Sequence, residues 1–172
     1  MKTILVTLCF TCAAFAQAPD MKSLTGPIKA NQNQVKTNIV RSAEKMPEEN
    51  YNFKPTPDVR SFGELIGHVA DAQYLFCSAS LNEKSPALNI EKSKHTKAEL
   101  TAALSDAFAY CDKAYAAFTD ANAAEPLKFF GSERSRNGVL AFNAMHNFEH
   151  YGNIVTYMRL KGLVPPSSEP KK

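Results

Sequence analysis

The chain has 172 residues, which is enough for one domain with a hydrophobic core of its own. Its apolar fraction of 44% and charged fraction of 22% are typical of a globular protein and argue against a disordered chain. The formal net charge of +3 is too small for the strongly basic surface that nucleic-acid binding requires, so we expect no nucleic-acid partner.

The first 18 residues have the pattern of a cleavable signal peptide. Lys2 gives a basic start, an apolar run follows from Ile4 to Phe15, and alanines at 14, 16 and 18 precede two candidate cleavage points. The run is too short to span a bilayer, for which about 20 apolar residues are needed. We therefore predict that residues 1–18 are removed, that the mature protein is periplasmic or secreted, and that it has no membrane contact after cleavage.

Removal of this signal would leave two of the four cysteines, Cys77 and Cys111. A disulfide between them is permitted in an oxidising compartment. Both cysteines lie in helix-like segments, where they could equally be small buried hydrophobic residues. Spacing alone does not supply the geometry that a disulfide needs, so the sequence leaves this pairing open.

An amphipathic helix is predicted over residues 26–46. Its apolar residues recur at spacings of three, four and seven and are Ile28, Val35, Ile39, Ala43 and Met46. Pro47 ends this helix because proline lacks the backbone donor that the next turn needs. Residues 47–60 contain three prolines and are predicted to be a non-helical connection, in which Tyr51 and Phe53 can anchor the chain on the bundle.

A second helix is predicted to begin at a capping box formed by Ser61 and Glu64, in which each side chain bonds to the backbone of the other residue. A broad apolar face follows and ends near residue 82; it contains Phe62, Leu65, Ile66, Val69, Tyr74, Leu75 and Phe76. His68 shares a face with Leu65 and Leu75, so we predict that its side chain points toward the interior.

A third helix is predicted over about residues 97–119. It begins at a second capping box, formed by Thr96 and Glu99. One side of this helix is apolar and contains Leu100, Leu104, Phe108, Cys111, Tyr115 and Phe118. The preceding segment, residues 83–95, is predicted to be a polar loop in which His95 lies in solvent.

A fourth helix is predicted over about residues 138–161, after a break at residues 120–137 that includes a short extended piece at 127–130. Gly162 suits the left-handed conformation that often ends a helix. The tail, residues 168–172, is predicted to be disordered. Four long helices without a set of strands predict an all-α fold, a four-helix bundle.

The fourth helix carries two histidines, His146 and His150, four residues apart. Side chains with this spacing point the same way on a helix, so two neutral imidazoles would form half of a metal site. An inward His68 would add a third nitrogen and leave positions open for water or substrate, as in catalytic rather than closed structural sites. Histidines that are hydrogen-bonded in the core without a metal are the alternative. Gly152, just after the pair, is interpreted as a small residue that permits close helix approach.

The run His146-Asn-Phe-Glu-His150 also fits the H-x-x-E-H motif of inverted zinc peptidases, with Glu149 as general base. That motif takes an acidic ligand far downstream, whereas only 22 residues follow His150, so the peptidase interpretation is set aside. Glu149 and Tyr151 remain candidate catalytic acid–base residues. Asp71 and Asn153 are candidates to support the metal ligands, although a solvated position explains Glu149 and Asp71 equally well.

Four stretches of the chain, taken in order, have motifs of a known family. They are Lys45-Met-Pro-Glu-Glu-Asn-Tyr-Asn-Phe-Lys-Pro55, Arg60-Ser-Phe-Gly-Glu-Leu-Ile-Gly-His-Val-Ala-Asp71, His146-Asn-Phe-Glu-His-Tyr-Gly-Asn153 and Arg159-Leu-Lys-Gly-Leu-Val-Pro-Pro166. The second and third resemble the first metal-ligand motif and the paired-histidine motif of the DinB-like family. The resemblance covers about residues 26–167 and implies a four-helix bundle that binds one divalent metal through His68, His146 and His150, often as a homodimer.

The resemblance also implies a class of activity: a metal-dependent hydrolase or transferase that uses Zn, Ni or Mn on a small-molecule substrate of unknown identity. Relatives include transferases and isomerases of low-molecular-weight thiols, in which the metal lowers the pKa of the thiol. Many relatives read His-Arg-Gly-Gln where this chain reads His150-Tyr-Gly-Asn153, so a basic group beside the metal is missing locally. A metal-binding or scaffold bundle without enzymatic activity is the alternative.

Overall fold

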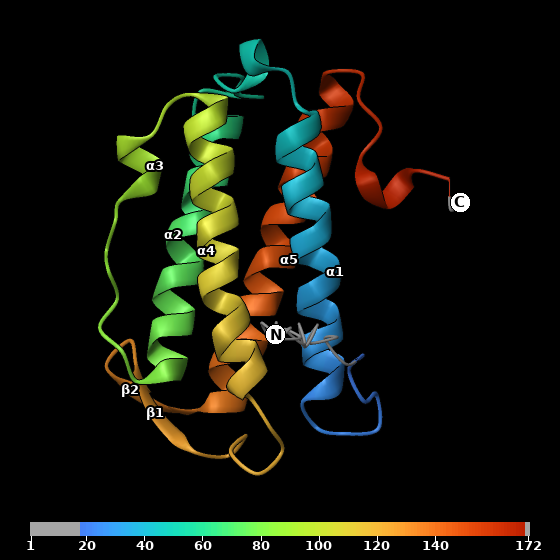
Figure 1. Cartoon of the computed structure of the whole chain (residues 1–172). Coiled ribbons are helices and arrows are strands. Elements are labelled where there is room, and N and C mark those ends of the chain that lie inside the picture. The colour runs from blue at the N-terminus through green and yellow to red at the C-terminus, as the bar shows by residue number, and fades with distance from the viewer. Residues whose placement is uncertain (1–17, 171–172) are drawn as a thin grey trace, which may run out of the picture.

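The computed structural model describes residues 18–170 and shows a bundle of helices (Figure 1). Within this range the four long helices are α1 (Gly26–Lys45), α2 (Phe62–Leu81), α4 (Lys97–Ala117) and α5 (Arg136–Leu160). Helix α2 packs against α4 and α5, and α1 packs against α5 and α4, so the core lies between the four. The predicted four-helix bundle is confirmed. The predicted signal peptide falls almost entirely on residues 1–17, outside the described residues, and stays a prediction.

The two predicted capping boxes set the points where α2 and α4 begin. The Ser61 hydroxyl accepts from the backbone N–H of Glu64 at 3.1 Å, and the Glu64 carboxylate accepts from the backbone N–H of Ser61 at 2.6 Å. Thr96 and Glu99 make the same reciprocal pair at α4. These bonds satisfy backbone donors that a helix start leaves without partners. The start of α2, from which His68 follows within two turns, is therefore held firmly.

Helix α5 begins at Arg136, two residues before the predicted start, because Ser135 caps it by accepting from the backbone N–H of Gly138 at 3.0 Å. After its last residue, Leu160, the chain passes through Gly162 with φ of +71°. Glycine adopts this left-handed conformation without steric cost, so the predicted helix end at Gly162 is confirmed.

Three short elements lie between the long helices. A 3-10 helix, Glu48–Asn50, lies in the proline-containing connection, where helix had been excluded. A four-residue helix, α3 (Ile90–Ser93), lies in the segment predicted to be a polar loop. Both predictions were wrong over these residues, because a single turn is too short to show apolar periodicity.

The third short element is an antiparallel hairpin between α4 and α5, so the prediction of a purely all-α fold is corrected to a mainly helical one. Its strands are β1 (Pro126–Phe129) and β2 (Ser132–Ser135), with Leu127 opposite Arg134. Strand β1 matches the predicted extended piece. The two residues between the strands, Phe130 and Gly131, have φ of +49° and +73°, as tight two-residue hairpin turns require.

The C-terminal segment folds back beside α1 (Figure 1). It forms a 3-10 helix, Pro166–Ser168, and the next residue, Glu169, pairs with Lys45 at 2.8 Å and with Arg41. Ser168 and Glu169 therefore depart from the disordered tail predicted over residues 168–172. Residues 171 and 172 lie outside the described range.

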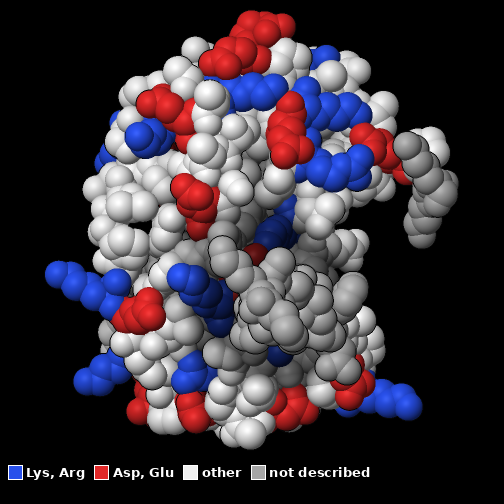
Figure 2. Space-filling model, viewed as in Figure 1, with Lys and Arg blue, Asp and Glu red and all other residues white. Residues whose placement is uncertain are grey.

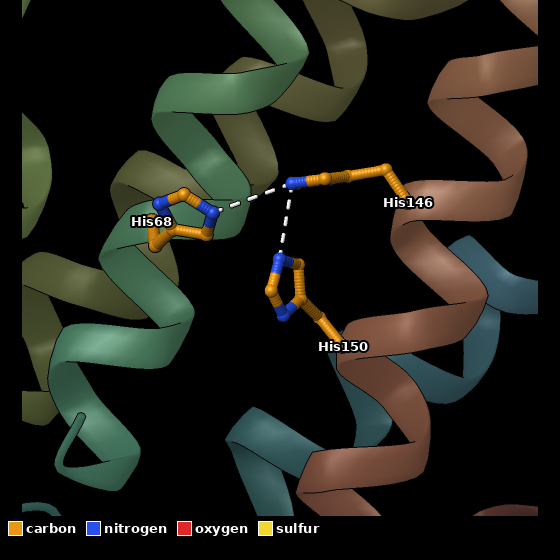
Figure 3. Close-up of side chains that lie close together, drawn as sticks. All are labelled: His68, His146 and His150. Atoms are coloured by element: carbon orange, nitrogen blue, oxygen red, sulfur yellow. Dashed lines mark hydrogen bonds between the residues drawn. The ribbon is translucent and has the colours of Figure 1, made fainter. Parts of the chain in front are cut away.

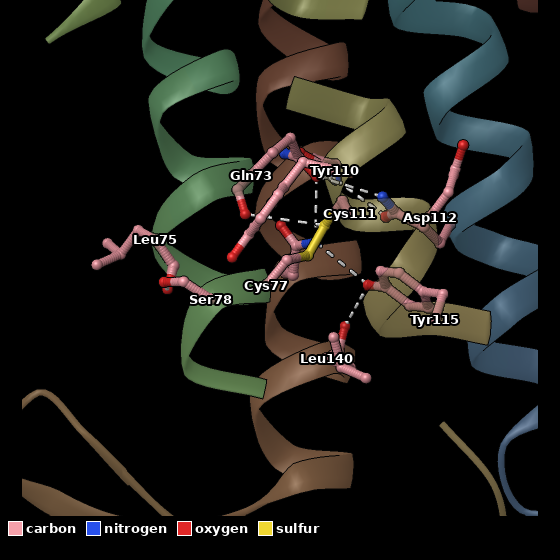
Figure 4. The surroundings of a disulfide bond; sticks show 12 residues. Gln73, Leu75, Cys77, Ser78, Tyr110, Cys111, Asp112, Tyr115 and Leu140 are labelled. Atoms are coloured by element: carbon pink, nitrogen blue, oxygen red, sulfur yellow. Dashed lines mark hydrogen bonds between the residues drawn. A yellow bond between two sulfur atoms is a disulfide. The ribbon is translucent and has the colours of Figure 1, made fainter. Parts of the chain in front are cut away.

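A disulfide joins Cys77 of α2 to Cys111 of α4, with their Cα atoms 5.2 Å apart (Figure 4). Both residues are at most 1% exposed. The side-chain nitrogen of Asn143 on α5 lies 3.7 Å from the Cys77 sulfur and 3.4 Å from the Cys111 sulfur. The structure thus pairs the two cysteines whose state the sequence left open.

A buried polar layer crosses the bundle between this disulfide and the paired histidines. It consists of Gln32, Gln73, Asn143 and Asn147, which are 0–2% exposed. Gln73 donates to Asn147 at 2.8 Å, and Asn147 donates to Gln32 at 3.0 Å. Buried amides need such partners. Because the bonds join α1, α2 and α5, they specify how α2 and α5 face each other near the histidines.

On the surface, Lys and Arg side chains are interspersed with Asp and Glu on the face shown in Figure 2. Over residues 18–170, none of the helices combines the length and the apolar character needed to cross a membrane.

Candidate metal centre

The three predicted metal ligands converge between α2 and α5 (Figure 3). His68 comes from α2, and His146 and His150 come from successive turns of α5. The Nε2 atom of His146 lies 3.3 Å from Nε2 of His68 and 3.0 Å from Nε2 of His150. One ring nitrogen from each histidine lies within 4.8 Å of the others. The predicted convergence of these side chains is confirmed.

These separations fit a shared divalent cation. Metal–nitrogen bonds of about 2.0–2.1 Å with bond angles of about 90–110° place two ligand nitrogens about 3.0–3.4 Å apart. The observed spacings of 3.3 Å and 3.0 Å lie in this range. Imidazole nitrogens suit Zn, Ni and other first-row transition metals. The donor set that the chain presents therefore fits such an ion.

Both histidines of α5 stay neutral at physiological pH. Burial, assisted by the neighbouring imidazoles and Arg60, lowers the pKa of His146 to about 4 and that of His150 to about 3. Neutral rings keep the lone pair that binds a metal. The Nδ1 atom of His146 is buried and has no hydrogen-bond partner among the described residues. The polar contacts of this ring are therefore made by its Nε2 atom.

Glu91, which the sequence did not indicate, supports His68 from α3. One carboxylate oxygen of Glu91 lies 3.1 Å from Nδ1 of His68, and the other accepts from Nε of Arg60 at 2.9 Å. A carboxylate on Nδ1 holds the proton there and leaves the Nε2 lone pair facing the metal position. Glu91 lies 23 residues from His68 in a segment without periodicity, so no local signal could have found it.

Asp71 and Gly67 place Glu91 against His68. The Asp71 carboxylate accepts from the backbone N–H groups of Ile90 at 2.8 Å and Glu91 at 3.0 Å. Gly67 lies where α3 crosses α2, and a Cβ added there would lie 2.6 Å from the Cα of Glu91. Asp71 therefore supports His68 indirectly. It contacts no imidazole itself, but it holds the backbone of α3, which carries Glu91.

Asn153 contacts His150 in the way that Glu91 contacts His68, at the ring nitrogen that faces away from the other two histidines. Its side-chain amide lies 3.4 Å from Nδ1 of His150. The amide carries both an oxygen acceptor and an NH₂ donor, so its oxygen can serve a protonated Nδ1 if the amide plane turns. This arrangement would leave Nε2 of His150 for the metal.

Glu149 and Tyr151, the predicted catalytic residues, do not join the site. The Glu149 side chain is exposed and makes no hydrogen bond within the described residues. The Tyr151 ring is 6% exposed, and its hydroxyl is engaged by Ser167, with contacts of 2.8 Å and 3.0 Å. Successive helix residues point about 100° apart, so neither side chain follows its neighbour His150. Neither side chain makes a hydrogen bond to the three imidazoles within the described residues, and their acid–base roles stay predictions.

The prediction that Gly152 permits a close approach between helices was wrong. A Cβ at this position would meet no described atom within 4 Å, so Gly152 is not the site of a close helix approach. His68 in turn lies at the edge of the core rather than deep inside, with 26% of its side chain exposed. His95 is exposed outside the site, as predicted.

A cleft of about 710 Å³ lies next to the site, although none of the three histidines lines it. Its walls come from the connection before α2, from the first turns of α2 and from α5, and they include Arg60, Glu91 and Asn153. Glu91 contacts His68, and Asn153 contacts His150. A small molecule in this cleft would therefore lie one side chain away from the candidate metal ligands.

The fold and the site define a class of protein: a helical bundle with one candidate mononuclear metal centre. Its three imidazoles come from the second and the last long helix, and a cleft lies one side chain away. The chain belongs to the DinB superfamily, whose family model matches residues 33–154 and so includes all three histidines.

Solved structures show the same fold. A DinB-like protein from Bacillus cereus ATCC 10987 is 15% identical, with a TM-score of 0.72 over 84% of this chain and 96% of that one. A conserved protein from Enterococcus faecalis is 16% identical, with a TM-score of 0.66 over 80% and 96%. A DinB-like protein (YjoA) from Bacillus subtilis is 21% identical, with a TM-score of 0.63 over 84% and 99%. No curated protein matches the sequence.

Proposed function

We propose that the protein binds one divalent metal ion through His68, His146 and His150 and acts as a metal-dependent hydrolase or transferase on a small molecule. The observation that carries this proposal is the convergence of the three rings, in which Nε2 of His146 lies at cation-sharing distances from Nε2 of both His68 and His150. When bound, such an ion supplies Lewis acidity and lowers the pKa of a coordinated water or thiol.

Two features support an open site over a closed structural one. No fourth His, Cys, Asp or Glu joins the cluster within the described part of the chain, whereas structural zinc sites have four protein ligands. The nearest carboxylate, Glu91, is directed at Nδ1 of His68 and at Arg60. The cleft also gives a small molecule room one side chain away from the ligands, next to Glu91 and Asn153.

The chain's own residues would orient the site. Glu91 holds the ring of His68, and Asn153 borders the ring of His150. None of the three histidines lines the cleft, and this separation favours the second candidate, a metal-binding bundle without enzymatic activity. The two candidates share the metal centre and differ in whether the cleft binds a substrate.

Export is part of the proposal. Residues 1–18 have the signal pattern, and the buried Cys77–Cys111 disulfide is of a kind that persists in oxidising compartments. Intact mass measurement of the protein isolated from the periplasm or medium should show a chain that begins after residue 16 or 18. A product that retains Met1 would contradict export.

Elemental analysis tests the metal centre directly. The purified mature protein should contain about one equivalent of Zn, Ni or Mn, and the His146→Ala/His150→Ala variant should lose it. His95→Ala is the matched control, because His95 is an exposed histidine outside the site. Equal metal content in wild type and in the double variant would refute the proposal.

A further inference from the structure

Arg60 lies at the junction of the cleft and the candidate metal centre. Its Nε atom donates to Glu91 at 2.9 Å, and the other oxygen of the same carboxylate contacts His68. Its backbone carbonyl accepts from the hydroxyl of Tyr157 at 2.6 Å. The residue is thus held through both its backbone and its Nε atom, and its guanidinium is placed in the cleft wall.

The outer edge of this guanidinium is available for a ligand. Neither terminal nitrogen of Arg60 has a hydrogen-bond partner among residues 18–170, and 43% of the side chain is exposed. Two parallel N–H groups on one edge match the two oxygens of a carboxylate or phosphate. Because Glu91 already takes the Nε donor, this edge is oriented before any ligand arrives.

Two cations line the cleft, Arg60 and Lys54, and each pairs with one carboxylate. Arg60 is the one whose planar group keeps two parallel N–H donors for a ligand. Lys54 is paired with Glu64 at 3.0 Å, and Glu64 also caps α2. The carboxylate of Glu91 is paired with Arg60 and His68. Asp58 is exposed in the cleft lining and has no ion-pair partner within the described residues, so it should repel an anion. An oxyanion in the cleft would therefore gain from Arg60 and lose from Asp58.

We propose that this cleft binds the oxyanion end, a carboxylate or phosphate, of a small anionic substrate through the terminal nitrogens of Arg60. The rest of the molecule extends along α2 and α5 past Glu91 and Asn153 toward the three histidines. The position of the other end of the substrate, near the metal, rests on the proposed function. The contact between the oxyanion and Arg60 does not depend on a metal. Arg60 is thereby a specificity-determining residue that selects anionic molecules.

Calorimetric titration of the metal-free protein with succinate and with inorganic phosphate tests this contact. Succinamide, which has the length of succinate without its charge, is the ligand control. Arg60→Gln should weaken binding of the preferred anion by about 10- to 100-fold, the range for losing a charge-assisted pair, and Asp58→Asn should strengthen it. Arg134→Gln is the matched control, because Arg134 is an exposed arginine of β2 at the opposite end of the bundle (Figure 1).

The two titrations distinguish carboxylate from phosphate as the bound chemistry. The proposal is supported if Arg60→Gln weakens binding of either anion by about 10-fold or more and Arg134→Gln leaves it unchanged. Three outcomes would overturn it. The two variants could bind the anion with equal affinity, the wild type could bind neither anion, or succinamide could bind as tightly as succinate. Zinc titration of the same samples separates the two proposals. Zinc binding without Arg60-dependent anion binding removes only this inference, and anion binding without zinc binding removes only the metal centre.

Discussion

A Cβ atom added at Gly67 would lie 2.6 Å from the Cα of Glu91 and 2.9 Å from its backbone nitrogen. The missing side chain at Gly67 is what lets α3 lie against α2 closely enough for the Glu91 carboxylate to reach His68. A backbone contact one residue before a candidate metal ligand thus sets the orientation of that ligand.

Gly67→Ala should weaken metal binding although it changes no ligand. The added methyl group forces α3 away from α2, which moves Glu91 off His68, and such overpacking costs about 1–3 kcal/mol of stability. Gly152→Ala is the control, because it lies beside His150 with open space around its Cβ among the described atoms. It should raise stability by up to about 1 kcal/mol through helix propensity. Zinc titration and urea unfolding of both variants check this, and equal zinc affinity in the two would contradict it.

Glu91→Gln should lower metal affinity by about 10- to 100-fold, the usual effect of removing an outer carboxylate from a ligating histidine. The amide keeps the size of the side chain but loses the charge that favours a proton on Nδ1 of His68. Competition with a zinc-binding dye measures the change. Glu133→Gln is the matched control, because Glu133 is an exposed acid of β2 whose side chain makes no ion pair within the described residues. An affinity as high as that of wild type would show that Glu91 does not orient the ligand.

The Cys77→Ala/Cys111→Ala variant should unfold more readily. The disulfide closes a loop with a sequence separation of 34, and loss of such a bridge costs about 3–4 kcal/mol in the chain-entropy account. Urea unfolding of the mature wild type and of the variant gives the difference. A thiol assay on the unreduced mature protein should find no free thiol, and two titratable thiols would exclude the bridge.

Acid should destabilise the metal-free protein before it protonates many carboxylates. The pKa of His146 is lowered to about 4 and that of His150 to about 3, from 6.5, so the unfolded chain binds protons at these sites at a higher pH than the folded chain does. The free energy of unfolding therefore has its full value above about pH 6.5 and falls as the pH drops from 6.5 to 4. Urea unfolding at pH 7.5 and 5 should show a steeper loss in wild type than in His146→Ala/His150→Ala. Equal losses would show that these rings do not resist protonation.

Substitution of Glu149 or Tyr151, the two predicted catalytic residues, should spare the metal centre. Tyr151→Phe removes the hydroxyl that bonds to Ser167 and should cost about 1 kcal/mol of stability. Glu149→Gln alters an exposed group and should change stability by less than about 0.5 kcal/mol. Both variants should retain the metal content of wild type in elemental analysis. Loss of metal from either would place that residue back in the site.

Several features of this protein follow from the sequence alone because their causes are local. The capping residues Ser61 and Thr96 lie within three positions of the backbone groups that they satisfy. The pairing of His146 and His150 follows from the helical period, which places residues four apart on one face. The predicted metal ligands therefore came from spacing and from the resemblance between motifs, and the structure brings them together.

The tertiary structure alone decided which residues surround those ligands. Glu91 reaches His68 across 23 positions through a helix of one turn, and its approach depends on Gly67. Glu149 and Tyr151 are the sequence neighbours of His150, but the helical rotation turns their side chains away from its direction. The hydroxyl of Tyr151 contacts Ser167 instead. Packing between segments that are distant in the sequence sets these contacts. Such packing produces no periodic or local sequence pattern, so the contacts could not be predicted from the sequence.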